Sequence, residues 1–417
     1  MKVYFDHAAT TPLDKRVKKA MEPYFSHQYG NPGGLYALGN QARLAVVKAR
    51  ENIARVLNCF SGEVVFTGSG TESDNLAIIG VARAYQNPPH SPFIKGGGKR
   101  NLGHIITTKI EHHAVLEPCA YLEKYGFDVT YLPVDKNGLV DPKDVAKALR
   151  KDTILVSVMY ANNEIGTIQP IKEISKVIKN FRKKNPLQSP FVKGGGKGDF
   201  NLPIFHTDAC QAAAYCDLDV NKLGVDLMTF NGGKIYGPKG VGVLYCRRGV
   251  KIEPMIYGGE QEAGLRSGTE NVPAIVGMAQ ALTLARKEKD KEIKKLSELR
   301  DYLIDGILKS IPKSFLNGDK EKRLPNNVNI SILDIEGEAM VLYLDAKGVM
   351  CSTGSACTSL TLEPSHVLLA IGRNPGTAHG SLRLTMGREN TKKEVDYFLK
   401  ILPGIVKKLR GISPVKM

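Results

Sequence analysis

A cysteine near the C-terminus and a lysine in a glycine-rich turn are the two residues of this chain best suited to take part in a reaction. Cys357 lies in the run Ser352–Ser359, which reads STGSACTS and is soon followed by a proline. Such small residues predict a mobile loop rather than a packed element. Lys234 lies in GGKIYGPKG, where glycines leave the backbone open to a ligand. A Schiff-base lysine and a mobile thiol together suggest carbonyl-cofactor chemistry on a sulfur substrate. A surface lysine and a core cysteine are the plain alternatives.

Other polar residues follow or lie on predicted strands. Asp208 ends an apolar strand, where a carboxylate suits a pyridine nitrogen, although a helix N-cap gives the same pattern. The turn Gly68–Glu72 (GSGTE) joins a strand to a helix and presents N–H groups and a hydroxyl to a phosphate. His112 could stack on a flat ring, with a solvent-facing histidine as the alternative. Arg383 predicts an anionic partner, either a substrate carboxylate or a structural salt bridge.

Composition limits the class of protein. The chain has 417 residues, 42% hydrophobic and 24% charged, which is typical of globular proteins with room for two domains. We expect no membrane span and no signal peptide, because neither pattern occurs. Seven cysteines without CxxC pairs favour a reducing, cytoplasmic compartment over a disulfide framework. The net charge of +16 indicates a solvated basic surface, with an acidic protein or tRNA partner as the alternative.

Apolar runs alternate with helical patterns up to about Gly264, which predicts an α/β fold with a mainly parallel sheet covered by helices. The predicted strands are Val64–Thr67, His104–Thr108, Val129–Leu132, Thr153–Met159, Ile204–Asp208, Leu227–Phe230 and Gly242–Cys246. The predicted helices are Asp14–Tyr24, Gly39–Leu57, Glu72–Tyr85, Ala114–Tyr125, Pro142–Leu149 and Ile171–Lys184. A long helix near Val272–Ser310 then leads into an α+β segment, with strands near Val328–Leu333, Val349–Ser352 and Ser381–Thr385. We therefore expect a domain boundary near Gly264.

Two nearly identical segments interrupt this pattern. SPFIKGGGK at residues 91–99 recurs as SPFVKGGGK at residues 189–197, with eight of nine residues matching. Two copies do not make a solenoid, so we interpret them as basic surface insertions. Phosphate binding by their glycine-rich turns is an alternative, although the P-loop pattern is absent.

In their order and spacing, the motifs resemble those of cysteine desulfurases, the fold-type I enzymes of iron–sulfur cluster assembly and nitrogenase maturation. The resemblance extends over nearly the whole chain. It rests on FDHAATTPLD (5–14), FTGSGTESDNLAI (66–78), EHHAVLEPC (111–119), NNEIGTIQP (162–170), HTDACQAAA (206–214), KIYGPKGVG (234–242), GLRSGTENVP (264–273), STGSACTSLTLEPSHVL (352–368) and SLRLTMGRENT (381–391).

The resemblance implies a fold-type I PLP-dependent transferase, with a mainly parallel seven-stranded sheet in its large domain and a smaller α+β C-terminal domain. Residues 15–264 would form the large domain, which binds pyridoxal phosphate and contains the two basic inserts. Residues 1–14 and 265–417 would form the small domain, which carries the mobile cysteine loop 352–363. A homodimer is implied as well.

The resemblance also implies how the cofactor ring is held. Lys234 would form the Schiff base with pyridoxal phosphate, and Asp208 would pair with the pyridine nitrogen. Gln211 would lie near the ring hydroxyl, and His112 would stack on the ring.

The phosphate would be bound by Gly70 and Thr71, with Thr269 reaching in from a second subunit. Serine and histidine usually precede the lysine in this family, but here Asn231 and Gly233 stand in their places. Asn231 can still donate a hydrogen bond, whereas Gly233 cannot replace an imidazole. A lost hydrogen bond to a charged group costs about 1.5–3 kcal/mol, so cofactor retention is expected to suffer.

The implied reaction converts L-cysteine to L-alanine. Asn163, which would also contact the cofactor, and Arg383 would grip the substrate carboxylate. Lys234 or His112 would remove the Cα proton, and Cys357 would take the sulfur as a persulfide. A cluster scaffold protein or a tRNA-thiolation relay would accept that sulfur.

Two alternatives remain open from the sequence. A protein that binds pyridoxal phosphate weakly or not at all would serve as a sulfur or iron–sulfur scaffold, with Cys357 as a ligand to iron. Selenocysteine cleavage is the second. An aminotransferase has no need of a mobile cysteine, so Cys357 argues against that reaction.

Overall fold

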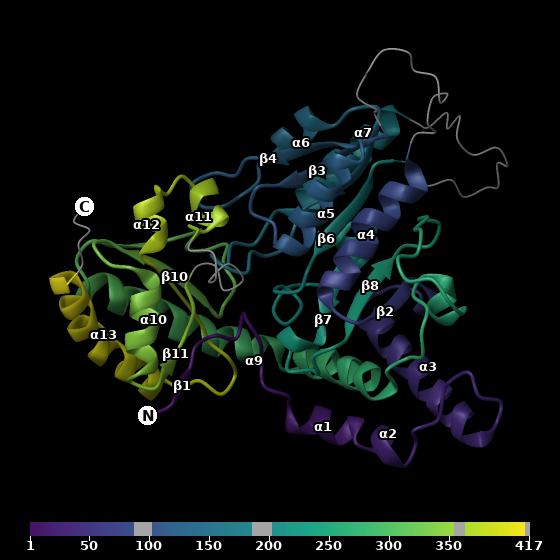
Figure 1. Ribbon diagram of the computed structural model, residues 1–417, viewed down its shortest axis with the longest axis horizontal. Coiled ribbons are helices and arrows are strands. Elements are labelled where there is room, and N and C mark those ends of the chain that lie inside the picture. The colour runs from purple at the N-terminus through teal and green to yellow at the C-terminus, as the bar shows by residue number, and fades with distance from the viewer. Residues whose placement is uncertain (87–101, 186–201, 354–362, 413–417) are drawn as a thin grey trace.

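The computed structural model describes residues 1–86, 102–185, 202–353 and 363–412 (Figure 1). Both SPFxKGGGK segments and Cys357 lie outside the described residues. Within the described ranges, no helix is both long and apolar enough to cross a membrane.

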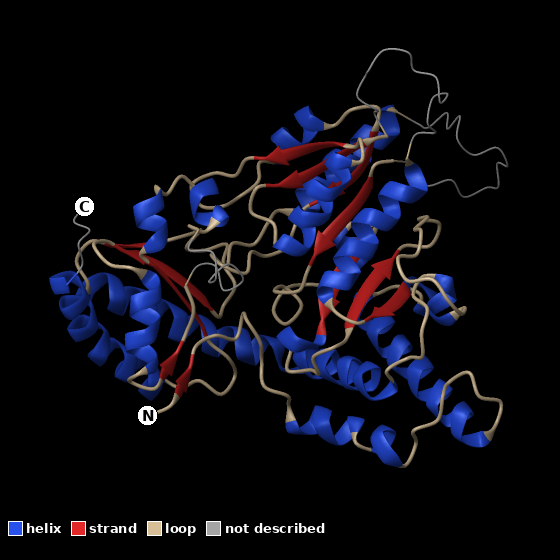
Figure 2. Cartoon of the chain, in the orientation of Figure 1, coloured by secondary structure: helices blue, strands red, loops and turns tan. Residues whose placement is uncertain are grey.

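A seven-stranded sheet forms the centre of the larger part of the molecule (Figure 2). Its order is β2-β8-β7-β6-β5-β3-β4, and β8 alone runs antiparallel to its neighbours. The predicted mainly parallel sheet is therefore confirmed. Its strands are β2 (Val64–Thr67), β3 (His104–Thr108), β4 (Asp128–Leu132), β5 (Thr153–Ser157), β6 (Ile204–Asp208), β7 (Leu227–Asn231) and β8 (Gly242–Cys246).

Helices cover both faces of this sheet, because successive apolar residues of each strand point to opposite faces. In β2, Val64 and Phe66 pack in one apolar cluster, whereas Val65 packs in another on the opposite face. The first cluster includes α3 (Ala37–Leu57) and α7 (Ile171–Lys184), and the second includes α4 (Gly70–Tyr85) and α5 (His113–Lys124). The shorter elements here are α1 (Lys15–Met21), α2 (Pro23–Ser26), α6 (Pro142–Ala148), α8 (Val220–Leu223), η1 (Ser61–Glu63), η2 (Gly232–Lys234) and η3 (Gln261–Gly264).

Several predicted elements differ from the structure by one or two residues at an end, and one predicted helix is divided. The predicted helix Asp14–Tyr24 is two helices, because Pro23 begins α2 and a proline cannot continue the hydrogen-bond pattern of α1. The predicted strand ending at Met159 ends as β5 at Ser157. Backbone bonds to the neighbouring strand still continue beyond it, from Tyr160 N to the Asp208 carbonyl oxygen at 2.8 Å.

The helix α9 (Val272–Ser310) connects the two parts of the molecule, and its predicted bounds are confirmed. It begins at Asn271, whose side chain accepts a hydrogen bond from the Ala274 N–H. It packs against α1 and α3 of the larger part and against β9, β10 and α13 of the smaller part (Figure 1).

The smaller part contains two short sheets. The strands β12, β10 and β9 form an antiparallel sheet, and β1 pairs in parallel with β11. This pairing supports our proposal that the start of the chain belongs to the small domain. The domain boundary near Gly264 stays a prediction. The elements are β1 (Val3–Tyr4), β9 (Ser314–Leu316), β10 (Asn327–Ile332), β11 (Val349–Met350), β12 (Ser381–Thr385), α10 (Gly337–Asp345), α11 (His366–Ala370), α12 (Pro375–His379) and α13 (Lys392–Ile412).

One arginine links the N-terminal segment, α9 and the turn after β12. The Arg388 Nη1 atom lies 2.7 Å from Asp14 Oδ2 and 3.3 Å from Glu288 Oε2. Its guanidinium also lies over the Tyr236 ring, 3.8 Å from the centroid. Asp14 and Glu288 also pair with Arg16. Glu292 Oε1 on α9, however, lies 3.1 Å from Arg388 Nε and pairs with no other arginine among the described residues. The partly buried guanidinium therefore stabilises the junction, because its removal leaves the buried Glu292 without its cation.

We expect Arg388→Met to destabilise the protein by about 3 kcal/mol, the low end for a broken buried pair because this one is partly exposed. Thermal unfolding followed by circular dichroism measures the change. Lys392→Met is the matched control, because Lys392 pairs with Asp396 on the exposed side of one helix, and its loss should leave the midpoint unchanged. Equal midpoints for both variants and the wild type would contradict the role of Arg388.

Candidate active site

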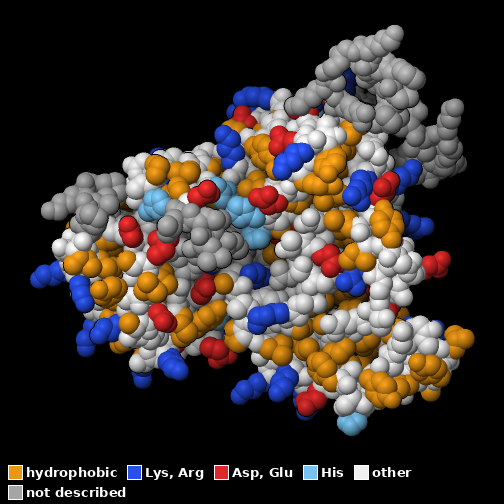
Figure 3. Space-filling view, viewed as in Figure 1, with side chains coloured by type: hydrophobic (Ala, Val, Ile, Leu, Met, Phe, Trp, Pro, Cys, Tyr) orange, Lys and Arg blue, Asp and Glu red, His pale blue; other side chains and the backbone are white. Residues whose placement is uncertain are grey.

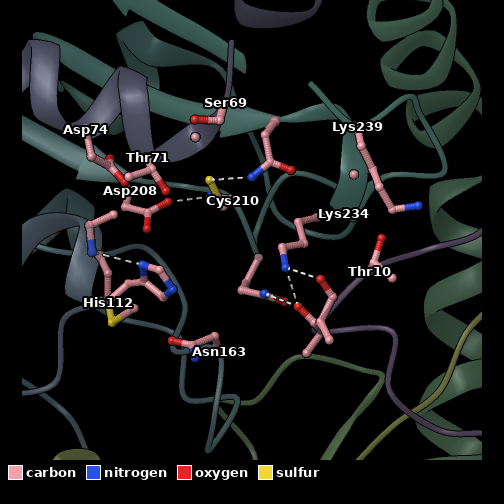
Figure 4. Close-up of a pocket in the computed structure, with 18 of the residues that line it drawn as sticks. Thr10, Ser69, Thr71, Asp74, His112, Asn163, Asp208, Cys210, Lys234 and Lys239 are labelled. Carbon is pink, nitrogen blue, oxygen red and sulfur yellow. Dashed lines mark hydrogen bonds between the residues drawn. The ribbon is translucent and has the colours of Figure 1, made fainter. Parts of the chain in front are cut away.

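A pocket of about 490 Å³ opens at the carboxyl ends of the parallel strands (Figure 4). This volume lies in the range of small-molecule sites. We call it the Lys234 pocket. Nine of the site residues predicted from the sequence line it, namely Gly70, Thr71, His112, Asn163, Asp208, Gln211, Asn231, Lys234 and Arg383.

Two predicted site residues are not among those lining the pocket. Thr269 is exposed, in the loop between η3 and α9. Cys357 lies outside the described residues. Most of the predicted site residues are therefore brought together at one pocket of a single chain.

Lys234 is held at the pocket by the N-terminal segment. It ends the short turn η2 that follows β7. Its Nζ donates to the carbonyl oxygens of Ala8 and Ala9, at 2.7 and 2.5 Å. Gln211 Nε2 also donates to the Ala8 carbonyl, at 3.0 Å. Backbone carbonyls thus fix the position of the amine without neutralising its charge (Figure 4).

The start of α4 forms a cradle suited to an anion. Ser69 is the N-cap, and its Oγ accepts a hydrogen bond from the Glu72 N–H at 3.0 Å. The N–H groups of Gly70 and Thr71 have no intrahelical acceptor at this helix start. Together with the Thr71 hydroxyl and the helix dipole, they favour a phosphate.

Asn231 and Cys210 pack tightly against this cradle. Asn231 Nδ2 donates to Cys210 Sγ at 3.3 Å. A Cβ atom added to Gly70 would lie 2.8 Å from each of those atoms. Position 70 is therefore restricted to glycine by packing, because these side chains occupy the space that a methyl group would need.

Asp208 at the end of β6 and His112 in the segment after β3 line the same pocket, and β5 lies between those two strands in the sheet. Asp208 is 6% exposed, and its Oδ1 accepts the Cys210 N–H at 2.8 Å. His112 is the N-cap of α5, and its Nδ1 accepts the Ala114 N–H at 3.0 Å. Burial lowers the pKa of His112, against the opposing effect of Asp208. The ring is thus neutral near pH 7 with its proton on Nε2, and its Nδ1 lone pair is already engaged.

Two further carboxyl groups lie buried behind Asp208. Asp74 is 1% exposed, and its Oδ1 lies 3.5 Å from His206 Nε2. Burial raises the pKa of Asp74, and the charge of Asp208 raises it further. Burial also raises the pKa of Glu111 to about 8, although Oε1 accepts bonds from Met159 N and Thr108 Oγ1 at 2.9 and 2.8 Å. Glu111 is therefore neutral near pH 7, and burial favours the protonated form of Asp74 as well.

The opposite side of the pocket carries Arg383 on β12. Its Nη2 lies 2.9 Å from Asp6 Oδ1, and its Nη1 donates to the Asn163 carbonyl at 3.3 Å. The structural salt bridge left open from the sequence is thus present. Nε is buried and has no hydrogen-bond partner among the described residues, so the guanidinium retains a donor for a carboxylate ligand.

Among the lining residues that were not predicted as site residues, three have ionisable side chains. Cys210 directly precedes the predicted Gln211, and Asp74 follows the predicted Thr71 by one turn of α4. Lys239 belongs to the same glycine-rich turn as Lys234. Their proximity in sequence to predicted residues was the available signal, because neighbours on a strand end or a helix turn share a surface.

The donor set of the pocket fits pyridoxal phosphate. It combines a primary amine for the aldehyde, a carboxylate for the pyridine nitrogen, an imidazole near the ring and a helix start for the phosphate. The cavity volume and this chemistry agree with one another.

Comparisons with known proteins point the same way. A profile of the aminotransferase class-V family matches residues 3–184 and 201–398. The chain is 51% identical over 414 residues to cysteine desulfurase IscS of Dictyoglomus turgidum, covering 99% of this chain and 97% of the relative. It is 49% identical over 413 residues to cysteine desulfurase IscS of Methanosarcina thermophila, covering 99% and 94%.

Solved structures share the fold. A NifS-like protein superimposes with a TM-score of 0.85 at 37% identity, over 98% of this chain and all of the other. A structure described as SspA in complex with cysteine gives a TM-score of 0.76 at 33% identity, covering 92% and 99%.

The raised pKa of Glu111 predicts a pH dependence of stability. Between about pH 4.5 and 8 the unfolded chain releases this proton while the folded chain keeps it, so stability falls as pH rises, by at most about 1.4 kcal/mol per pH unit. Glu111→Gln should remove that slope, as measured by urea unfolding at several pH values. The exposed Glu389→Gln serves as the control. Parallel profiles for wild type and Glu111→Gln would rule out a neutral Glu111.

Proposed function

This chain belongs to the aminotransferase class-V family and is a cysteine desulfurase, and we propose that the Lys234 pocket is where it binds pyridoxal phosphate and L-cysteine. The reaction releases L-alanine and supplies sulfur to iron–sulfur cluster assembly. The observation that carries the assignment is that an amine, a carboxylate, an imidazole and a helix start line one pocket.

Different residues of the pocket would bind different parts of the cofactor. Lys234 would hold it covalently, Asp208 would face the pyridine nitrogen and Gln211 the ring hydroxyl. Thr71 and Asn231 would donate to the phosphate. When bound, pyridoxal phosphate supplies an electron sink that stabilises negative charge at the substrate Cα.

Arg383 and Asn163 would bind the substrate carboxylate. The guanidinium is almost completely buried, and Asp6 orients it from the N-terminal segment. A carboxylate that enters a water-poor pocket gains more from this cation than it would at the surface. The structure of SspA with cysteine, at 33% identity, supports the same class of substrate.

Lys234 is the better candidate for the Cα proton acceptor. The lowered pKa of His112 leaves its ring with a single proton, and because Nδ1 accepts the Ala114 N–H, that proton is on Nε2. A neutral ring in this state donates a hydrogen bond but has no lone pair to spare. His112 would therefore orient and stack, while the amine moves the proton.

Cys357 would act as the sulfur acceptor. Its thiolate attacks the substrate sulfur, the S–S bond forms, and the C–S bond breaks with its electron pair left on carbon, which takes a proton to give alanine. The chain on either side of residues 354–362 supports this proposal. Ser352 exchanges backbone hydrogen bonds with Arg383, at 2.7 and 3.3 Å. His366 Nε2 lies 2.9 Å from the Glu111 carbonyl oxygen. Both attachment points lie beside the pocket.

The persulfide would pass to a cluster scaffold protein, with a tRNA-thiolation relay as a second recipient. The reaction leaves a sulfur that is electrophilic and reversibly held, which suits transfer to another thiol.

We expect a visible absorption band from the bound cofactor that shifts when L-cysteine is added. Lys234→Ala should lose the band of the lysine-bound cofactor. Cys357→Ser should keep the band and its shift, but lose alanine formation by roughly three orders of magnitude or more. Cys351→Ser is the matched control, since Cys351 is half-buried outside the pocket. Alanine formation at the wild-type rate by Cys357→Ser would show that another group takes the sulfur.

We further propose that the enzyme is a homodimer. Large apolar side chains gather on α2, the start of α3 and the segment between them, which we call the α2–α3 patch (Figure 3). Their exposed fractions are 64% for Phe25, 67% for Tyr29, 97% for Leu35 and 60% for Tyr36. A contiguous patch of this kind favours burial against a partner. The exposed position of Thr269, outside its own pocket, supports the same arrangement.

Light scattering on the purified protein should give twice the chain mass. Leu35→Glu combined with Tyr29→Glu should shift it to the monomer mass, because charge is excluded from an apolar interface. Leu342→Glu is the control, since Leu342 is 70% exposed on α10. A monomeric wild type, or a double variant that stays dimeric, would argue against the α2–α3 patch as the interface.

A further inference from the structure

The cofactor site proposed above needs positive charge near the phosphate. A phosphate monoester carries about two negative charges at neutral pH. The lysine and arginine side chains that line the Lys234 pocket belong to Lys234, Lys239 and Arg383. Lys234 is assigned to the aldehyde, and Arg383 is paired with Asp6. Neither Lys234 nor Arg383 is therefore assigned to the phosphate.

Lys239 is free to supply that charge. Among the described residues it forms no hydrogen bond or ion pair. Figure 4 shows it at the other end of the pocket from His112, on the side of Lys234. A lysine carries its charge on a flexible four-carbon stem, so its ammonium group can move toward an anion without a change in the backbone.

Contacts around Gly233 connect Lys239 to the phosphate cradle. A Cβ atom added to Gly233 would lie 3.7 Å from Asn231 Oδ1 and 3.7 Å from Lys239 Cγ, with nothing closer. Asn231 in turn lies against Gly70, since its Nδ2 is 2.8 Å from where a Cβ of that glycine would be. Gly70, Asn231, Gly233 and Lys239 therefore follow one another along one wall of the pocket.

The backbone conformation at position 233 does not require glycine. Its φ angle is not in the left-handed region, and ordinary van der Waals space surrounds its missing side chain. The absence of a side chain at this position instead leaves room that the Lys239 stem borders. A polar side chain at position 233 and the ammonium group of Lys239 would compete for the same place beside the phosphate.

We propose that Lys239 binds the cofactor phosphate and supplies the charge that position 233, as glycine, does not. The proposal rests on the proposed function, because it assumes that pyridoxal phosphate occupies the Lys234 pocket.

The test is an equilibrium titration of the cofactor-free protein with pyridoxal phosphate and, separately, with pyridoxal, which lacks the phosphate. Lys239→Met keeps the stem and removes the charge. We expect its dissociation constant for pyridoxal phosphate to rise roughly 10- to 100-fold, the loss of one charged hydrogen bond, with that for pyridoxal unchanged. Lys239→Arg should retain most of the affinity.

Two further variants sharpen the result. Lys287→Met removes an exposed charge on α9 and should leave both constants unchanged. Gly233→His should recover phosphate-dependent affinity in the Lys239→Met background, because it restores a donor at the same place. An unchanged constant for pyridoxal phosphate in Lys239→Met would overturn the proposal, and so would equal losses for both ligands. A wild type that binds neither ligand would instead refute the proposed cofactor site itself.

Discussion

The first residues of the chain hold the pocket together, because they bond to both parts of the molecule. The strand β1 pairs with β11 of the smaller part. Asp6 forms an ion pair with Arg383, and the Ala8 carbonyl accepts from Lys234 Nζ on the larger part. Two of the groups proposed to act on substrate and cofactor are thus positioned by one extended segment. The relative position of amine and guanidinium depends on that segment together with direct contacts between the two parts, such as the hydrogen bond from Arg383 Nη1 to the Asn163 carbonyl oxygen.

Electrostatics in the pocket depends on which acids stay neutral. Burial raises the pKa of Asp74, and raises that of Glu111 to about 8, so the protonated forms of both carboxyl groups behind Asp208 are favoured. Additional negative charges there would repel one another in a poorly solvated space. The same burial lowers the pKa of His206 to about 3. The sheet therefore carries several ionisable side chains to the back of the site with little net charge.

Packing couples the residues of the phosphate end to one another. The amide of Asn231 and the thiol of Cys210 fill the space beside Gly70, where a methyl group would be too close to both. On the other side of Asn231, Gly233 leaves room that the stem of Lys239 borders. In a close-packed wall of this kind, one substitution changes what its neighbours can be. The unusual lysine segment is thus one part of a consistent local arrangement.

The sequence by itself determined the elements and the local shape of their ends. Periodicity located all seven strands of the large sheet and the bounds of α9, and the turn before α4 indicated a phosphate cradle, since these features depend on neighbouring residues. Only the tertiary structure decided which residues far apart in the sequence come into contact. Asp6 and Arg383 are 377 residues apart, and Ala8 and Lys234 are 226 apart. Such contacts, and the raised pKa of Glu111, follow from sheet topology and burial, which no local pattern contains.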